Sequence, residues 1–418
     1  MQKTLFSMNY EEKGEEKMCK KEITSILLIA GTCIGSGTIA FPMVLAKLGI
    51  IPSIIIMLII WILNYYPSLS VMELNLRSEQ GLSLGTLGKK ISGKWAQMVG
   101  EISVKIISYA LLTTYLYGSA SIIQKLLEEY FNYALSVFTV ETIIATFGIL
   151  LLLLPLKIVS EINGMISSCL IFGFAILLGT IFILIDYHKI PWITNATPVN
   201  IISVCPIMFA AYGYQLILHT LRNYCGQDVL MLKHGILFGS LLPTLLYMLW
   251  SCFSLCVIFK SNPGFFIQLA AEKIEVGEFV MQLANVSSLS NFHAMVWLIS
   301  ILAIFTSFIG FSLGLAESWN FSLTKCSNLK NMQTSKFISS VLTVCPAYVI
   351  AAIVPNAFVK VFSFAGAMFV ITGILLPVYL LFKDGMHNLH YKELKKWPLI
   401  LCVFFGFCII AVEIFINN

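Results

Sequence analysis

Long apolar runs, separated by short polar segments, recur along the whole chain. A helix rises 1.5 Å per residue, so about 20 apolar residues cross a hydrocarbon core of about 30 Å. Backbone polar groups cannot stay unpaired in lipid, and the runs lack the alternation of a membrane barrel, so they predict helices. Eleven runs approach or exceed this length, at 23–48, 50–74, 98–123, 139–156, 162–185, 199–221, 235–259, 293–316, 337–354, 358–382 and 399–416.

The composition agrees with this pattern and excludes a soluble protein. Of the 418 residues, 58% are hydrophobic and 11% are charged, and the mean hydropathy is +0.88. Soluble domains carry about 25% charged residues. We therefore predict an all-α polytopic membrane protein, and neither a soluble enzyme nor a nucleic-acid-binding protein. The 11 cysteines form no C-x-x-C pair and no cluster with histidine, so we expect neither a metal site nor a cofactor.

Lysine and arginine are concentrated on one side of the predicted membrane. Residues 1–22 are polar and predict a cytoplasmic tail, and most of the 26 basic residues lie in this tail or in the even-numbered loops. Basic residues favour the cytoplasmic side, so the bias predicts a cytoplasmic N-terminus and, with eleven spans, an external C-terminus. The longest external connection, 260–292, has apolar residues at helical spacing and predicts a short helix over the mouth of the protein.

Two of the runs are interrupted near their middle. The first contains Gly31, Gly35 and Gly37, and the sixth contains Gly213. A glycine inside a helix costs about 1 kcal/mol relative to alanine, so both runs predict discontinuous helices; close helix packing is the alternative explanation. Because the breaks lie five runs apart, they predict a 5+5 inverted repeat followed by an eleventh helix. These three units are 23–185, 199–382 and 399–416.

Discontinuous helices offer a binding site for an amino acid zwitterion. The N–H groups that begin a second half-helix attract a carboxylate, and the C=O groups that end the first half-helix attract an ammonium group. Small residues let the backbone approach the ligand, and tyrosines offer rings to an aromatic side chain unless they pack against other helices. The predicted substrate-binding residues are Thr32, Cys33, Gly35, Ser36, Gly37, Tyr109, Tyr212, Gly213, Tyr214 and Gln215.

Four stretches of the sequence resemble one family of transporters. The stretch 31–42, Gly-Thr-Cys-Ile-Gly-Ser-Gly-Thr-Ile-Ala-Phe-Pro, is similar to the G-T-x-I-G-A-G-M-L-A-x-P first helix of the hydroxy/aromatic amino acid permeases. The stretches 109–121, 206–224 and 306–315 are similar to that family's third, sixth and eighth helices. This resemblance to the bacterial tryptophan and tyrosine permeases, in the amino acid–polyamine–organocation superfamily, implies an eleven-helix fold of the leucine-transporter type. It also implies import of tryptophan or tyrosine across the cytoplasmic (inner) membrane by symport with an ion, usually the proton.

The sequence departs from the family pattern at the sixth break. The family's F-G-F-H is Tyr-Gly-Tyr-Gln at 212–215, His219 replaces a proline, and Ser36 replaces an alanine. A symporter for small neutral or hydroxy amino acids is therefore the alternative. An ATP-driven pump or a membrane enzyme is disfavoured because the chain has no G-x-x-x-x-G-K-[ST] or H-E-x-x-H motif. The expected partners are the amino acid and membrane lipid, without nucleic acid or an obligate protein partner.

Two sets of residues are candidates for ion coupling. Thr306 and Ser307 are adjacent hydroxyls in the eighth run, and with first-helix carbonyls they could surround Na⁺, because hard cations prefer oxygen ligands. Glu73, Glu101 and His219 are ionisable groups within the predicted spans and are candidates to carry a proton. Alternatively, each glutamate forms an ordinary ion pair with the basic residue one turn further along the helix. Proton coupling is favoured by the resemblance, and sodium coupling is the alternative.

Overall fold

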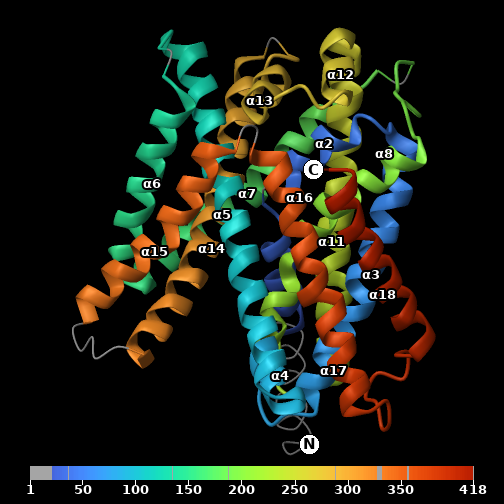
Figure 1. Ribbon diagram of the computed structural model, residues 1–418. Helices are drawn as coiled ribbons and strands as arrows, with labels where there is room; N and C mark the ends of the chain where they lie inside the picture. The colour runs from blue at the N-terminus through green and yellow to red at the C-terminus, as the bar shows by residue number, and fades with distance from the viewer. Residues whose placement is uncertain are drawn as a thin grey trace, which may run out of the picture.

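The computed structural model describes residues 21–35, 37–133, 135–186, 188–287, 289–326, 332–354 and 357–417. Two sequence predictions, the first twenty residues of the tail and Ser36, lie outside these described residues. Every regular element in the described part of the chain is a helix, as the apolar runs predict (Figure 1).

Nine helices among the described residues are long and apolar enough to cross a membrane. The continuous ones are α3 (Ile50–Leu76), α5 (Lys94–Phe131), α7 (Leu156–Leu184), α11 (Val229–Ser261), α14 (Ser290–Cys326), α15 (Met332–Ile353) and α18 (Lys396–Phe415). Two others consist of shorter pieces, namely α8 (Pro198–Ser203), α9 (Cys205–Ala210), η1 (Gly213–Ile217) and α10 (Leu218–Cys225), and then α16 (Ala357–Val370), η2 (Ile371–Leu375) and α17 (Leu376–Asp384). Helices outside these spans are α4 (Leu84–Ser92), α12 (Pro263–Ala270) and α13 (Val276–Ala284).

A bent pair of helices at the start of the chain is a further candidate span. The N-terminal helix Lys21–Cys33 and α2 (Gly37–Leu45) meet at an angle of 55°. The predicted run at 139–156 forms α6 (Val137–Leu153), which has 17 residues and is shorter than a typical span. Large apolar side chains such as Ile183 and Trp397 are 81% exposed, as contact with lipid requires. The chain is therefore a multi-pass membrane protein.

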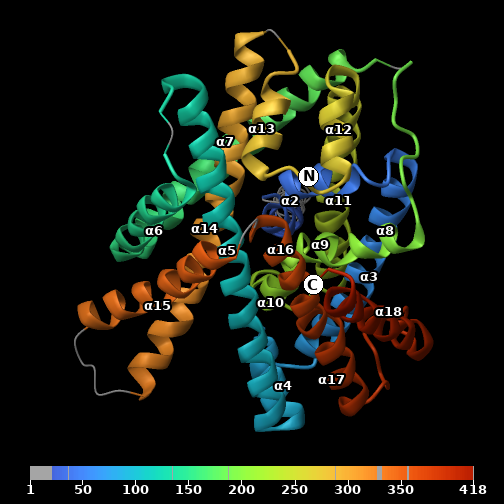
Figure 2. The ribbon, with the colours of Figure 1, turned by 45° about the horizontal axis from the view of Figure 1, so that its top comes forward.

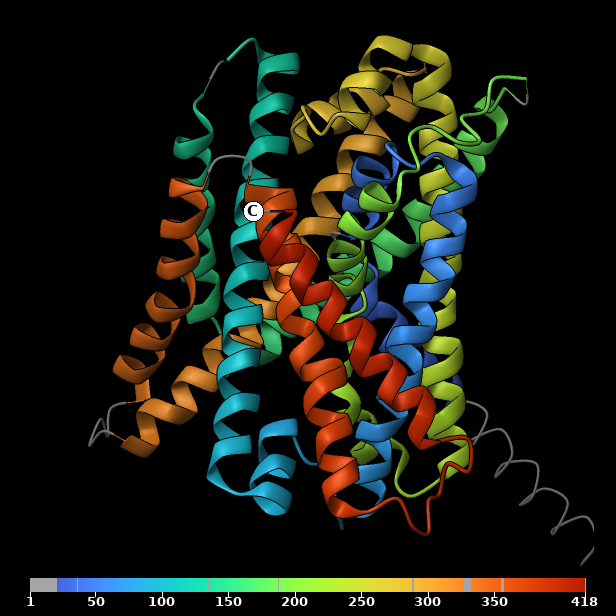
Figure 3. The ribbon, with the colours of Figure 1, turned by 45° about the vertical axis from the view of Figure 1, so that its right-hand side comes forward.

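The interrupted spans lie inside the bundle. In Figure 1, α5 and α16 run through its middle, with α6, α14 and α15 on one side and α3, α11 and α18 on the other, and Figure 3 shows α18 crossing in front of α16. A second view, in Figure 2, shows the same grouping. α9 packs against α16, α3 and α2, and α2 packs against α11. The two breaks are thus enclosed by long helices.

The two ends of the bundle carry different elements. α4 and the loop between α17 and α18 lie at one end, here named the α4 end, whereas α12 and α13 lie at the opposite end, the α13 end (Figure 1). The sequence predicts one short helix over 260–292, and the structure corrects this to two. Glu272 turns the chain after α12 with a φ of 57°, and a capping box formed by Glu275 and Glu278 then starts α13.

An irregular turn that the sequence analysis does not predict interrupts the tenth run. The π-turn η2 joins α16 to α17. A Cβ atom on its Gly373 would lie 3.5 Å from the side-chain carboxamide of Gln215, so the turn lies against the broken sixth span. π-turns frequently occur at functional sites.

Candidate functional site

The two predicted breaks are present and lie beside each other in the centre of the bundle. The N-terminal helix ends at Cys33 and α2 starts at Gly37, while α9 ends at Ala210 and η1 starts at Gly213. A Cβ atom on Gly37 would lie only 2.9 Å from the Cβ of Ala211, so a glycine is needed where the breaks touch. The break residues that line the small cavity between them are Thr32, Cys33, Gly37, Ala210, Ala211 and Gly213.

Two side chains of α11 satisfy backbone carbonyls at the first break. Tyr247 donates from its hydroxyl to the carbonyl oxygen of Cys33, at 2.5 Å. Trp250 donates from Nε1 to the carbonyl oxygen of Thr38, whose usual helical partner is missing because Pro42 has no N–H group. The Cys33 carbonyl, which we predicted to face an ammonium group, is therefore already engaged. Tyr247 and Trp250 could not be predicted from the sequence, because neither stands out from the apolar run that contains it.

The tyrosines of the sixth break point into the packing between helices. The Tyr212 hydroxyl shares a hydrogen bond with Thr244 Oγ1 (2.8 Å), and the Tyr214 hydroxyl donates to Ser68 Oγ (3.4 Å). Both side chains are at most 1% exposed, and neither lines a cavity near the breaks in the described part of the chain. The turn η1 has about three residues per turn and brings Gly213, between the tyrosines, to the cavity wall.

Gln215, a predicted substrate-binding residue, lines a cavity on the α4 side of the breaks and has a partner on α3. Its Nε2 donates to Asn64 Oδ1 at 2.8 Å, while its Oε1 has no partner among the described residues. Asn64 is fully buried. An amide side chain in the middle of an apolar run is a sequence feature that could have identified Asn64.

A cavity of about 490 Å³ extends from the breaks toward the α4 end. Small-molecule sites commonly enclose about 300–1,000 Å³, so this volume suits a ligand of that class. Thr32 and Gly213 line the cavity from the breaks, Ser307 lines it from α14, and Lys105 and His219 line it further along.

A second cavity, of about 460 Å³, adjoins the first. The two share Lys105, His219 and Ser318 in their walls. The second cavity also reaches Glu101 and then Ser83, which caps the N-terminus of α4. Together the cavities lead from the breaks to the α4 end.

The opposite, α13 end is closed over the breaks. Lys47, just beyond α2, forms an ion pair with Glu272 (Nζ to Oε1, 2.5 Å) and donates to Ser203 Oγ at 2.8 Å. The backbone N–H of Gly277 in α13 donates to Ser121 Oγ of α5 at 3.1 Å. Among the described residues, a small cavity of about 110 Å³ lies between α2, α12 and α13. The cavities at the breaks therefore open toward the α4 end.

The predicted hydroxyls of α14 lie against the first break. Thr306 Oγ1 and Ser307 Oγ both donate to the carbonyl oxygen of Ala303, at 3.1 and 3.2 Å. A Cβ atom on Gly35 would lie 2.1 Å from Ser307 Oγ, so this approach depends on glycine. The structure thus brings together the first break and the hydroxyl pair that the sequence analysis links to Na⁺.

Glu73, a predicted proton carrier, lies where α3 meets the loop between α17 and α18. Its fully buried carboxylate accepts hydrogen bonds from Arg77 Nε (3.1 Å) and from the backbone N–H groups of His390 (3.0 Å) and Tyr391 (3.2 Å). Glu73 therefore ties this loop to α3 and does not line either cavity. The other two predicted proton carriers do line them.

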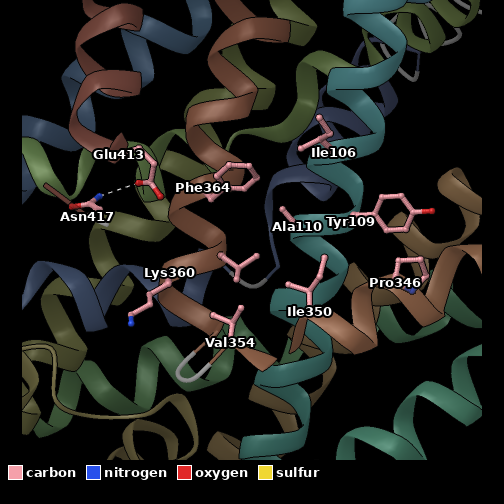
Figure 4. Close-up of a pocket in the computed structure, with 11 residues that line it drawn as sticks. Ile106, Tyr109, Ala110, Pro346, Ile350, Val354, Lys360, Phe364, Glu413 and Asn417 are labelled. Carbon is pink, nitrogen blue, oxygen red and sulfur yellow. Dashed lines mark hydrogen bonds between the residues drawn. The ribbon is translucent and has the colours of Figure 1, made fainter. Parts of the chain in front are cut away.

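Tyr109 lines a different cavity, shown in Figure 4. This cavity, of about 480 Å³, lies between α5, α15, α16 and α18 and includes Glu413, which accepts a hydrogen bond from Asn417 (3.1 Å). The Tyr109 hydroxyl points away from Glu413, donates to the carbonyl oxygen of Leu342 (2.6 Å) and accepts from Trp319 Nε1 (2.7 Å). The structure does not place Tyr109 at the breaks with the other predicted substrate-binding residues.

Known proteins resemble this chain over most of its length. Residues 18–416 match the tryptophan/tyrosine permease family. Tyrosine-specific transport system 1 of Haemophilus influenzae is 29% identical over 377 residues, which cover 89% of this chain and 91% of that protein. Tyrosine-specific transport system 2 of the same species is 24% identical over 411 residues, covering 95% and 97% respectively. The low affinity tryptophan permease of Escherichia coli O157:H7 is 25% identical over 363 residues, covering 86% of each chain.

Proposed function

The chain belongs to the tryptophan/tyrosine permease family, and we propose that it is a secondary symporter that imports tryptophan or tyrosine across the cytoplasmic membrane of a bacterium. The observation that carries this proposal is the pair of broken helices, whose cavity leads to one end of the bundle while the other end is closed. Alternating access needs such a one-sided opening around a fixed site. The same breaks support an eleven-helix, 5+5 inverted-repeat fold of the leucine-transporter type.

The substrate binds at the breaks as a zwitterion. Its carboxylate lies at the N-terminus of α2, which begins at Gly37, where backbone N–H groups and the helix dipole favour a negative charge. Its aromatic ring lies in the larger cavity against Leu170 and Phe311, and a well-placed ring contact adds about 0.5–1.5 kcal/mol beyond burial. The breaks at 31–37 and 210–215 contain no charged side chain, which suits a substrate with no net charge.

The driving ion in this proposal is the proton, and sodium is the second candidate. Glu101 and His219 line the cavities and are the groups that take up and release the proton. One contact favours sodium, namely the approach of Ser307 Oγ to the backbone at Gly35, since hydroxyl and carbonyl oxygens are ligands for hard cations.

The α4 end faces the cytoplasm in this proposal, with the N-terminus inside and the C-terminus outside. Lys89 and Lys90 in the last turn of α4, and Lys383 in the last turn of α17, lie at this end, in keeping with the excess of basic residues on cytoplasmic surfaces. The structure then represents the inward-open state.

Uptake into proteoliposomes tests the proposal. Labelled tryptophan and tyrosine are compared with serine, leucine and glutamine under an imposed proton or sodium gradient. We expect accumulation of an aromatic amino acid and its loss in Gly213→Leu, because a Cβ there already lies 3.2 Å from Phe369 and the longer side chain fills the cavity. Gly179→Leu on α7 is the matched control, since nothing lies within 4 Å of its Cβ position. The proposed function is contradicted if neither tryptophan nor tyrosine accumulates under either gradient.

A further inference from the structure

We propose that Glu101 and Lys105 form a second, transient binding site for the amino acid zwitterion, between the breaks and the α4 end. This inference rests on the proposed function and adds a site to the same route. Both residues line the 460 Å³ cavity, and Lys105 also lines the 490 Å³ cavity that begins at the breaks. A substrate that leaves the breaks toward the α4 end therefore passes them.

Glu101 and Lys105 have the spacing of a helical ion pair but do not form one. They lie one turn apart on α5, in the order that usually favours pairing, with about 5–6 Å between Cβ atoms. Instead, Glu101 Oε1 accepts from Gln97 Nε2 at 2.8 Å, and Lys105 Nζ lies 4.3 Å from the centre of the Trp319 ring. Neither residue forms an ion pair with any other described residue. Two opposite charges therefore face the route without neutralising each other.

The ring that holds Lys105 is itself fixed. Trp319 donates from Nε1 to the Tyr109 hydroxyl (2.7 Å), which donates in turn to the carbonyl oxygen of Leu342 on α15 (2.6 Å). This chain of hydrogen bonds joins α14, α5 and α15. An ammonium group over an aromatic face is attracted to it but keeps N–H donors for another acceptor. Lys105 can therefore bind a carboxylate without leaving its position.

Close packing of α4 on α5 holds Glu101. A Cβ atom on Gly85 of α4 would lie 2.9 Å from Glu101 Cγ, and one on Gly100 would lie 3.0 Å from the Cα of Gly85. The missing side chain of Gly85 leaves the space that the Glu101 side chain occupies, and the missing side chain of Gly100 lets the backbone of α4 approach α5. Gln97 engages one carboxylate oxygen, so the carboxylate keeps lone pairs for an ammonium group.

The chemistry of the pair matches the common part of every neutral amino acid. Lys105 binds the carboxylate and Glu101 binds the ammonium group through charge-assisted hydrogen bonds, which are about 2.7–2.9 Å long. The side chain of the substrate lies against the apolar part of the cavity wall, at Leu82, Leu84 and Phe321. Because Lys105 and Glu101 contact only the carboxylate and ammonium groups of the substrate, this site accepts small neutral amino acids as well as aromatic ones.

Equilibrium binding of labelled tryptophan or tyrosine to the full-length protein in lipid nanodiscs tests the inference. We expect two sites per chain in the wild type, and weakening of the second site by about tenfold or more in Lys105→Gln, with the first site unchanged. Lys105→Arg keeps the charge and should keep both sites. Lys157→Gln is the matched control, because Lys157 is 85% exposed on α7 and lies 3.9 Å from Glu161 in a surface pair.

A second measurement does not depend on the stability of a variant. Excess unlabelled alanine should displace labelled ligand from the second site of the wild type and leave the first site occupied. A wild type that transports but binds a single equivalent, with no alanine-sensitive fraction, overturns this inference and leaves the proposed function intact. Absence of both binding and uptake overturns the proposed function, and this inference with it.

Discussion

Replacing Gly35 with alanine tests how closely the first break approaches α14. The added Cβ would lie 2.1 Å from Ser307 Oγ, but 3.5 Å from Ser307 Cβ and 3.7 Å from the carbonyl oxygen of Ala303. Only the hydroxyl is in the way, and turning it aside breaks its 3.2 Å hydrogen bond to Ala303. Losing that bond costs about 0.5–1.5 kcal/mol, and overpacking costs about 1–3 kcal/mol. We therefore expect Gly35→Ala to lower the free energy of unfolding by about 1–3 kcal/mol.

Ser307→Ala supplies the background that isolates this contact. It removes the obstructing oxygen and leaves the two Cβ atoms 3.5 Å apart, an ordinary van der Waals distance. The double variant should be about as stable as Ser307→Ala alone, which gives a coupling energy of about 1–3 kcal/mol in the double-mutant cycle. Unfolding of the purified protein in detergent measures these differences. Equal destabilisation by Gly35→Ala in both backgrounds would refute the close approach.

Uptake by the same variants separates packing from ion binding. If Ser307 only packs against the break, the double variant regains uptake together with stability. If the Ser307 hydroxyl is a sodium ligand, stability returns but sodium-driven uptake does not. The two readouts therefore decide whether the Ser307 hydroxyl is a sodium ligand, without relying on loss of function alone.

Three further substitutions test other parts of the structure. Tyr247→Phe removes the hydroxyl that donates to the carbonyl oxygen of Cys33 at the first break. Loss of this hydrogen bond should weaken equilibrium binding of labelled substrate by up to about tenfold. Glu73→Gln removes the charge of a buried carboxylate from Arg77, which is partly exposed and also pairs with Asp384, and should lower the free energy of unfolding by roughly 1–3 kcal/mol; a stable but inactive protein would instead support proton transfer by Glu73. Lys47→Gln removes a partly exposed ion pair, whose small contribution to stability limits how much more readily the α13 end opens. Thiol labelling of a cysteine introduced at that end should therefore accelerate less than about fivefold.

The breaks could be predicted from sequence because their causes are local. Glycines at 31, 35 and 37 weaken one helix wherever it packs, and Gly213 does the same in the sixth run. Thr306 and Ser307 were predicted to lie near carbonyls of the first helix, and the structure places Ser307 Oγ against Gly35 of that helix, a neighbour that the sequence does not specify. Helix positions also followed from apolar run length, although α6 is shorter than its predicted run.

The partners of individual side chains could not be predicted, because they come from distant parts of the chain. Glu73 binds the backbone at His390, 317 residues later, and only the folded loop shows that its carboxylate is already engaged. The orientation of the Tyr212 side chain depends on the local geometry of the break, which turns the ring toward Thr244 on α11. Sequence spacing alone left both a pocket-facing and a packed orientation open for Tyr212.

Apolar packing, more than the Lys47–Glu272 ion pair, keeps the α13 end closed. Glu272 is 49% exposed on its side chain, and a pair of that kind contributes about 0–1 kcal/mol. Phe266, Leu269 and Phe279 of α12 and α13 are each at most 2% exposed, and burying such a side chain stabilises by about 1.5–3 kcal/mol. Opening this end exposes part of that surface to water. In the proposed alternating-access cycle the two states differ by only a few kcal/mol, so closing the two large cavities at the α4 end would have to bury comparable apolar surface.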